Sequence, residues 1–185
     1  MDSSNVSFGK GKATGAVFLA PKGTTVPTDA TTALAGAYVN MGYISEDGYA
    51  YEMSTDTEEI KDWNGRTVLT EQSSYTETHT VNFLETKADT LKAIFGAANV
   101  TEAGGVITVK STGAALEEHV LVIEVALTGG RVNRIVVPHA KIADRSGTIT
   151  FSATEALKYP AIFSASPDTA GNYHSEYIAT VSTSA

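Results

Sequence analysis

The stretch that most constrains the fold is residues 117–142, EEHVLVIEVALTGGRVNRIVVPHAKI, which is typical of two strands joined at Gly129-Gly130. Pairing Thr128 with Arg131 predicts one apolar face made of Leu121, Ile123, Val125, Leu127, Val132, Val136 and Ile142. The opposite face is also apolar in part, and its apolar members are Val120, Val122, Ile135 and Val137. A strand pair that is apolar on both faces is covered on both, either by a second sheet or by another subunit.

Alternating patterns elsewhere predict a mainly β fold. Residues 38–56 are expected to form two strands about an Asp47-Gly48 turn, with one apolar and one polar face. The period changes at TKADTLKAIFG, where Thr86 would cap a short amphipathic helix that ends at Gly96. We therefore predict two packed antiparallel sheets, in a β-sandwich or barrel, with one short flanking α-helix at about residues 87–96.

The stretch STDTEEIKDWNGRTVLTEQSS, residues 54–74, is polar and predicts a protruding hairpin over residues 55–73. Asn64-Gly65 is a strong signal for a two-residue turn with positive φ at both positions. That turn would pair Ile60 with Leu69 and bring Arg66 within cation–π reach of Trp63, the only tryptophan. A polar hairpin of this length buries little, so we expect a contact outside the segment to hold it.

The strand SYTETHTVNFLE, residues 74–85, has two unlike faces. The side expected to face the core contains Tyr75, Glu77, His79, Val81 and Phe83. The other side is polar and contains Thr76, Thr78, Thr80 and Asn82. Three residues of the preceding strands are expected on the same polar surface, Tyr43, Glu52 and Ser54.

Composition and motifs argue against an enzymatic function and against tight binding of nucleic acid. The chain has 21 acidic residues against 13 lysines and arginines, a net charge of −8, and it lacks cysteine. Phosphate binding requires cations, and thiolate metal sites require cysteine. The GKGKATG segment lacks the glycine spacing of a phosphate loop, and the four histidines lack HxH or HExxH spacing. We expect no enzyme, no cofactor, no metal and no membrane-spanning segment.

Two non-enzyme classes remain open from the residues alone. One is a β-sandwich binding or capsid-decoration module, and the other is a structural protein that assembles with itself. Polar arms at residues 1–15 and 167–185 flank a β domain at residues 16–166 and are expected to lie on neighbouring subunits. Together with the protruding hairpin and the two-faced strand pair, these arms favour the self-assembling class.

One ordered set of segments resembles a known family. GYISEDG, DTEEIKDWNG, THTVNFLETKADTLKAIFG, VVPHAKI and TEALKYPAIFSASPDTAGN follow one another as in the major tail tube proteins of long-tailed, siphophage-type bacteriophages. The resemblance implies a tail-tube β fold and hexameric rings stacked into a tube through which double-stranded DNA passes without specific binding. It also implies tape-measure and tail-end proteins as partners, the virion tail as location, and assembly in the host cytoplasm.

The residue patterns and the resemblance together give expected roles to the residues singled out above. The ring-stacking loop would use Glu58, Ile60, Asp62, Trp63, Arg66 and Leu69. The resemblance does not identify the strands of the lumen, and the expected wall is the polar face, with the outer solvent as the alternative for its threonines. The members of this face are Tyr43, Glu52, Ser54, Thr76, Thr78, Thr80 and Asn82. Contacts between subunits would come from Val120, Val122, Ile135 and Val137.

Overall fold

The computed structural model describes residues 2–181 and contains antiparallel strands and one short α-helix. Its strands are β1 (Gly9–Gly11), β2 (Val17–Pro21), β3 (Val39–Asn40), β4 (Ile44–Lys61), β5 (Thr67–Phe83), β6 (Val100–Ala103), β7 (Val106–Val109), β8 (Glu118–Leu127), β9 (Arg131–Asp144), β10 (Tyr159–Ala165) and β11 (Ser175–Thr180). The helical elements are η1 (Ser3–Asn5), α1 (Ala88–Phe95) and η2 (Ala97–Asn99). The mainly β prediction is confirmed.

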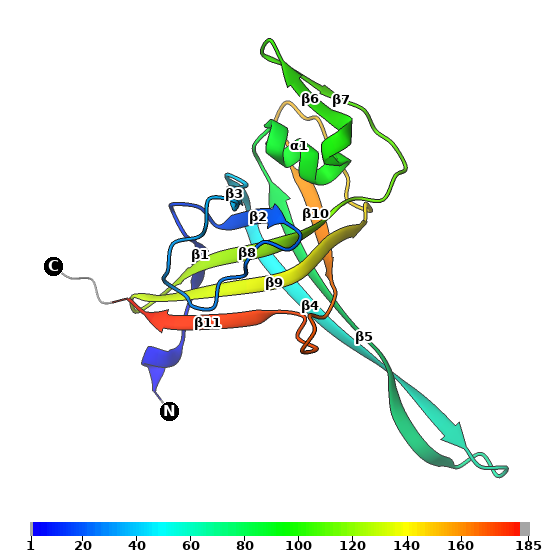
Figure 1. Ribbon diagram of the computed structural model, residues 1–185. Coiled ribbons are helices and arrows are strands. Elements are labelled where there is room, and N and C mark those ends of the chain that lie inside the picture. The colour runs from blue at the N-terminus through cyan, green and yellow to red at the C-terminus, as the bar shows by residue number, and fades with distance from the viewer. Residues whose placement is uncertain (1, 182–185) are drawn as a thin grey trace.

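The strands form one large branched sheet and one small one (Figure 1). The nine-stranded sheet has the order β3-β2-β8-β9-β10-β5-β4, while β1 also pairs with β8 and β11 also pairs with β9. The second sheet is the β6–β7 hairpin, which lies beside α1. The two antiparallel sheets are therefore very unequal, and most of the core lies against a single curved sheet.

The hairpin of β8 and β9 is apolar on both faces, as predicted, but its register differs. Leu127 pairs with Arg131 across a three-residue connection in which Gly129 and Gly130 have positive φ. A register shift between His119 and Leu121 then restores the expected Glu118–Lys141 pairing. The shift lies opposite Pro138, which has no N–H to donate to the ladder. Between these points Val136, rather than Val137, pairs with Val122.

Both faces of this hairpin are covered by the chain itself. One face packs into the main core with Phe83, Phe163 and α1 residues such as Leu91. The other face packs under the loop between β2 and β3, which contributes Val26 and Leu34 to a smaller cluster. The four residues predicted to contact other subunits are all buried, with Val120 and Val122 in the smaller cluster and Ile135 and Val137 in the main core. In this conformation they stabilise the subunit itself, and we do not propose them as intersubunit contacts.

The Asp47-Gly48 turn was predicted wrongly. Residues 44–61 form one strand, and residues 45–48 bulge out between the Ile44–Phe83 and Tyr49–Val81 pairs. The Asp47 carboxylate anchors this bulge by accepting hydrogen bonds from Ser45 and Lys158, both at 2.8 Å. A bulge bends a strand without ending it, so the chain continues along β5 instead of folding back on itself.

The short helix lies where predicted, but its cap differs. Helix α1 begins after Lys87, and no side chain caps it. The hydroxyl of Thr86, the predicted cap, instead shares a 3.0 Å hydrogen bond with the hydroxyl of Tyr159. Gly96 ends the helix with φ 95°, a region that favours glycine.

The segments predicted as arms contain strands of the main sheet. Gly9–Gly11 pairs with β8, and Ser175–Thr180 pairs with β9. The N-terminal segment also exposes two apolar side chains, Val6 and Phe8. Residue 1 and residues 182–185 of the predicted arms lie outside the described residues.

A matched pair of substitutions tests the assignment of Val122 to the core. Val122 is 0% exposed, whereas Val68 on β5 is 62% exposed. Val122→Lys buries an unpaired ammonium and should lower the free energy of unfolding by about 3 kcal/mol or more. Val68→Lys should leave it within about 0.5 kcal/mol of the original. Urea unfolding followed by circular dichroism measures both, and equal stability of the two variants would contradict the assignment.

Candidate functional site

The hairpin of β4 and β5 extends far beyond the rest of the subunit (Figure 1). Every residue from 50 to 74 is exposed except Asp62, which is half-buried. Strands rise about 3.3 Å per residue, so residues 50–61 extend for about 35–40 Å. The protruding hairpin is thus present, and it is longer than predicted because it continues two strands of the sheet.

The hairpin exposes apolar side chains that the chain does not cover. These side chains are Met53, Ile60, Trp63, Val68 and Leu69. Ile60 pairs with Leu69, as predicted, and Trp63 at the tip is 102% exposed. An isolated hairpin gains little stability from such side chains in water, so their arrangement favours a contact with another molecule.

The tip turn differs in type from the prediction. The Gly65 N–H donates to the Asp62 carbonyl at 2.9 Å, and only Gly65 has positive φ, so Asn64 is not in the left-handed region. The Asp62 carboxylate accepts the backbone N–H groups of Arg66 and Asn64, both at 2.9 Å, and these bonds, that of Arg66 most, hold its pKa below the ordinary value. The guanidinium of Arg66 also binds this carboxylate, at 2.9 Å, and leaves Trp63 at the apex of an ordered turn.

The base of the hairpin bears the predicted polar face. Glu52 pairs with Thr78 and Ser54 pairs with Thr76, so these four side chains share one side of the sheet. Their grouping matches the prediction although the turn that suggested it does not exist. Tyr43, a further residue predicted on this face, precedes β4, is exposed and donates its backbone N–H to Glu85 at 2.8 Å.

The polar face continues across five strands as one row. Glu118 of β8 pairs with Lys141 of β9, Lys141 with Ser164 of β10, Ser164 with Thr78 of β5, and Thr78 with Glu52 of β4. Thr80 and Asn82 lie on the same side of β5 and are half-buried. This row is polar with acidic groups at both ends, and its members are half-buried except Glu52, which is exposed.

A groove of about 940 Å³ lies between β1, the start of β4 and the β8–β9 hairpin. Two of its charged groups, Lys12 and Glu124, bind each other at 2.6 Å, and Glu124 also binds Arg134. Paired charges of this kind hold the strands together and are not free to bind an anionic ligand.

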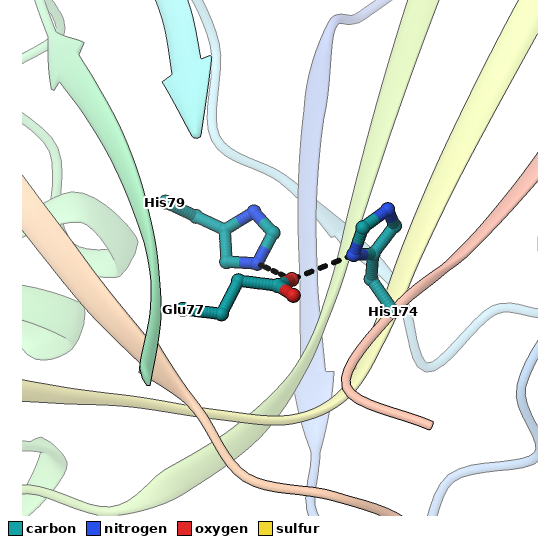
Figure 2. A group of neighbouring side chains, drawn as sticks. All are labelled: Glu77, His79 and His174. Carbon is teal, nitrogen blue, oxygen red and sulfur yellow. Dashed lines mark hydrogen bonds and ion pairs between the residues drawn. The ribbon is translucent and has the colours of Figure 1, made fainter. Parts of the chain in front are cut away.

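The structure also assembles a cluster that the sequence did not reveal (Figure 2). Glu77 Oε1 lies 2.8 Å from His79 Nε2 and 2.6 Å from His174 Nδ1. Tyr75 donates to Glu77 Oε2 at 2.9 Å, and the Tyr49 hydroxyl lies 2.6 Å from His79 Nδ1. Burial lowers the pKa of His79 and raises the pKa of Tyr49, which favours the neutral form of both.

The cluster was missed because His174 lies 97 positions after Glu77. Glu77 and His79 were predicted on the core side of their strand, and both are buried. Two adjacent titratable side chains on a core-facing strand require polar partners, and that requirement was the available signal. The segment before β11 supplies the partner, because β11 returns along β9.

Comparison with known proteins identifies one family. The family model described as phage tail tube protein matches residues 11–181. A search of curated proteins returned no match. Within residues 2–181, no helix has the length and apolar character needed to cross a bilayer.

The turn at the hairpin tip should depend on Asp62. In Asp62→Ala the N–H groups of Asn64 and Arg66 lose their acceptor, and amide exchange at both should accelerate about tenfold, the equivalent of a net hydrogen bond of about 1–1.5 kcal/mol. The exposed tip adds little to the core, so the melting temperature should not change. Amide hydrogen exchange by NMR measures the first effect, with Asp56→Ala lower on the hairpin as the control.

Proposed function

This chain belongs to the phage tail tube protein family, and we propose that six copies form a ring and that stacked rings form the tube through which double-stranded DNA is ejected. The family is one of structural proteins of the bacteriophage tail and is not a family of enzymes. The virion tail is accordingly the location of this protein. Hexameric symmetry, the siphophage type and DNA ejection are our proposals.

The protruding hairpin is the observation that supports ring stacking most directly. Its length of about 35–40 Å is comparable to the roughly 40 Å width of a compact body of this size. A subunit could therefore reach across a whole neighbour in the next ring. Trp63, with Ile60 and Leu69, supplies the apolar anchor of the kind that dominates interface energies. Glu58, Asp62 and Arg66 would form the polar rim of this contact.

The polar face at the base of the hairpin is our candidate for the lumen wall. Its exposed members at the hairpin base, Glu52, Ser54 and Thr76, present hydroxyls and a carboxylate to solvent. We assign Tyr43, Thr78, Thr80 and Asn82 to the edge of the same wall. A net charge of −8 per subunit repels phosphate, so DNA would pass without specific binding.

Other contacts complete the proposal. Val6 and Phe8 are exposed near the N-terminus and would pack on a neighbouring subunit of the ring. The tube would enclose a tape-measure protein and end on tail-end proteins, after assembly in the host cytoplasm. A decoration or binding module would lack the need for a repeated contact at the hairpin tip, so removing the tip distinguishes the two functions.

Shortening the hairpin should abolish stacking without unfolding the subunit. Thr57 pairs with Gln72, so replacing residues 58–71 by Asn-Gly closes the shortened ladder with a favourable turn. The variant should keep its melting temperature, because the removed residues are exposed apart from Asp62. Negative-stain electron microscopy should show long tubes for the original protein and none for the variant.

Trp63→Ala tests the anchor alone. Loss of an interface hot spot costs about 2 kcal/mol per contact, and stacked rings repeat the loss at every subunit, so tubes should be shorter and fewer. Phe151→Ala, which truncates another exposed aromatic residue outside the hairpin, is the control. Tubes of normal length from both the shortened hairpin and Trp63→Ala would refute the stacking role.

Glu52→Lys tests the lumen assignment. Each subunit would place a cation where the original has an anion, and the attraction to phosphate would repeat around every ring. Tubes should form normally, while DNA ejection from reconstituted particles should slow several-fold at low salt and recover at high salt. Glu102→Lys, an exposed change on β6, is the control. Equal ejection rates for the two variants at low salt would remove Glu52 from the wall.

A further inference from the structure

We propose that Glu77, His79 and His174 bind a divalent transition metal ion of the zinc class and thereby join the base of the protruding hairpin to the segment before β11. The proposal goes beyond tube formation and does not depend on it. Two imidazole nitrogens and one carboxylate oxygen form a donor set that Zn²⁺ prefers, with the fourth position left to water.

The donor atoms converge in a way that fits one ion. Glu77 Oε1, His79 Nε2 and His174 Nδ1 lie within 4.8 Å of one another. Around a tetrahedral Zn²⁺ with bonds of about 2.0–2.2 Å, neighbouring donor atoms are about 3.4 Å apart. The present contacts of 2.8 and 2.6 Å therefore need to open by less than about 1 Å. All three side chains already point to one place (Figure 2).

The groups behind the donors can hold them in this orientation. The Tyr49 hydroxyl lies 2.6 Å from His79 Nδ1, and Tyr75 donates to the second oxygen of Glu77 at 2.9 Å. A tyrosine hydroxyl both donates and accepts. When the ion takes the Nε2 lone pair, the proton moves to Nδ1 and donates to Tyr49. Contacts of this kind fix the tautomer and ring orientation of metal-binding histidines.

Burial of the donor side chains favours binding of a cation, and the partial exposure of His174 gives the ion access from solvent. The side chains of His79 and Glu77 are 0% and 1% exposed, so the carboxylate is desolvated. A divalent cation would offset that buried negative charge. The side chain of His174 is 17% exposed, which leaves one side open to solvent for the ion and its water. Glu176, 3.6 Å from His174 Nε2, adds negative potential at this opening.

Metal binding would create a cross-link between distant parts of the chain. Glu77 and His79 lie on β5 where the hairpin meets the body, and His174 directly precedes β11. Tyr51 of β4 already binds Glu176 of β11 at 3.0 Å. A bound ion would fix this junction more strongly than hydrogen bonds alone and would set the direction in which the hairpin leaves the body.

Isothermal titration of untagged, EDTA-treated and dialysed protein with ZnCl₂ tests the site. We expect one ion per chain, a higher melting temperature with zinc, and visible absorption typical of tetrahedral Co²⁺ when CoCl₂ replaces ZnCl₂. His174→Ala should weaken zinc binding by at least about tenfold and abolish the melting shift. His139→Ala is the control, because it removes another histidine in contact with a glutamate, Glu118, outside the cluster.

Absence of zinc binding to the original protein would overturn the proposal and leave a hydrogen-bonded network. Binding that is unchanged in His174→Ala would overturn it equally, since the ion would then lie elsewhere. Circular dichroism establishes that the variants are folded before titration. If His174→Ala does not fold, His174→Gln, which retains a polar side chain at this half-exposed position, replaces it. The Co²⁺ spectrum of the original protein tests the coordination without any variant.

Discussion

Burial of the β8–β9 hairpin on both faces is the constraint around which the rest of the subunit is arranged. One face packs against residues of β5, β10 and helix α1, and the other packs against the loop between β2 and β3. The edges of the hairpin are equally occupied, by β1 and β2 on one side and β10 and β11 on the other. Because β8 and β9 are already covered, β4 and β5 are not needed to cover them along their full length. These two strands therefore extend beyond the body of the subunit.

Much of the fold followed from local pattern. The two-faced hairpin, the helix ending at Gly96 and the core side of β5 depend on periodicity and glycine conformation, which act over a few residues. The errors lie where long-range contacts decide. Asp47-Gly48 is a sequence typical of a turn. The residues on either side of it pair with β5, Ile44 with Phe83 and Tyr49 with Val81, so the segment between them is a bulge. Thr86 is a residue type that commonly caps helices, yet its hydroxyl forms a hydrogen bond with the hydroxyl of Tyr159 instead.

Some features of the candidate surfaces could likewise be predicted from local sequence, and others depend on long-range contacts. Ile60 opposite Leu69, and the polar side of β5, could be derived from the tip sequence and from alternation alone. The coverage of both faces of β8–β9 within one subunit could not be derived, because it depends on a loop whose threonines and glycines carry no periodic signal. The cluster at Glu77 could not be derived either, because His174 reaches it only when β11 pairs with β9. A pairing between strands so far apart in the sequence has no local sequence signal.

The continuity of β5 from tip to core has a mechanical consequence. Thr67, next to the tip turn, and Phe83 in the core belong to one strand. Hydrogen bonds of an antiparallel ladder lie perpendicular to the strands, so tension along the hairpin loads many of them in shear at once. A pull on the tip is thereby distributed along the β4–β5 and β5–β10 ladders into the centre of the body, instead of peeling a loop from its surface.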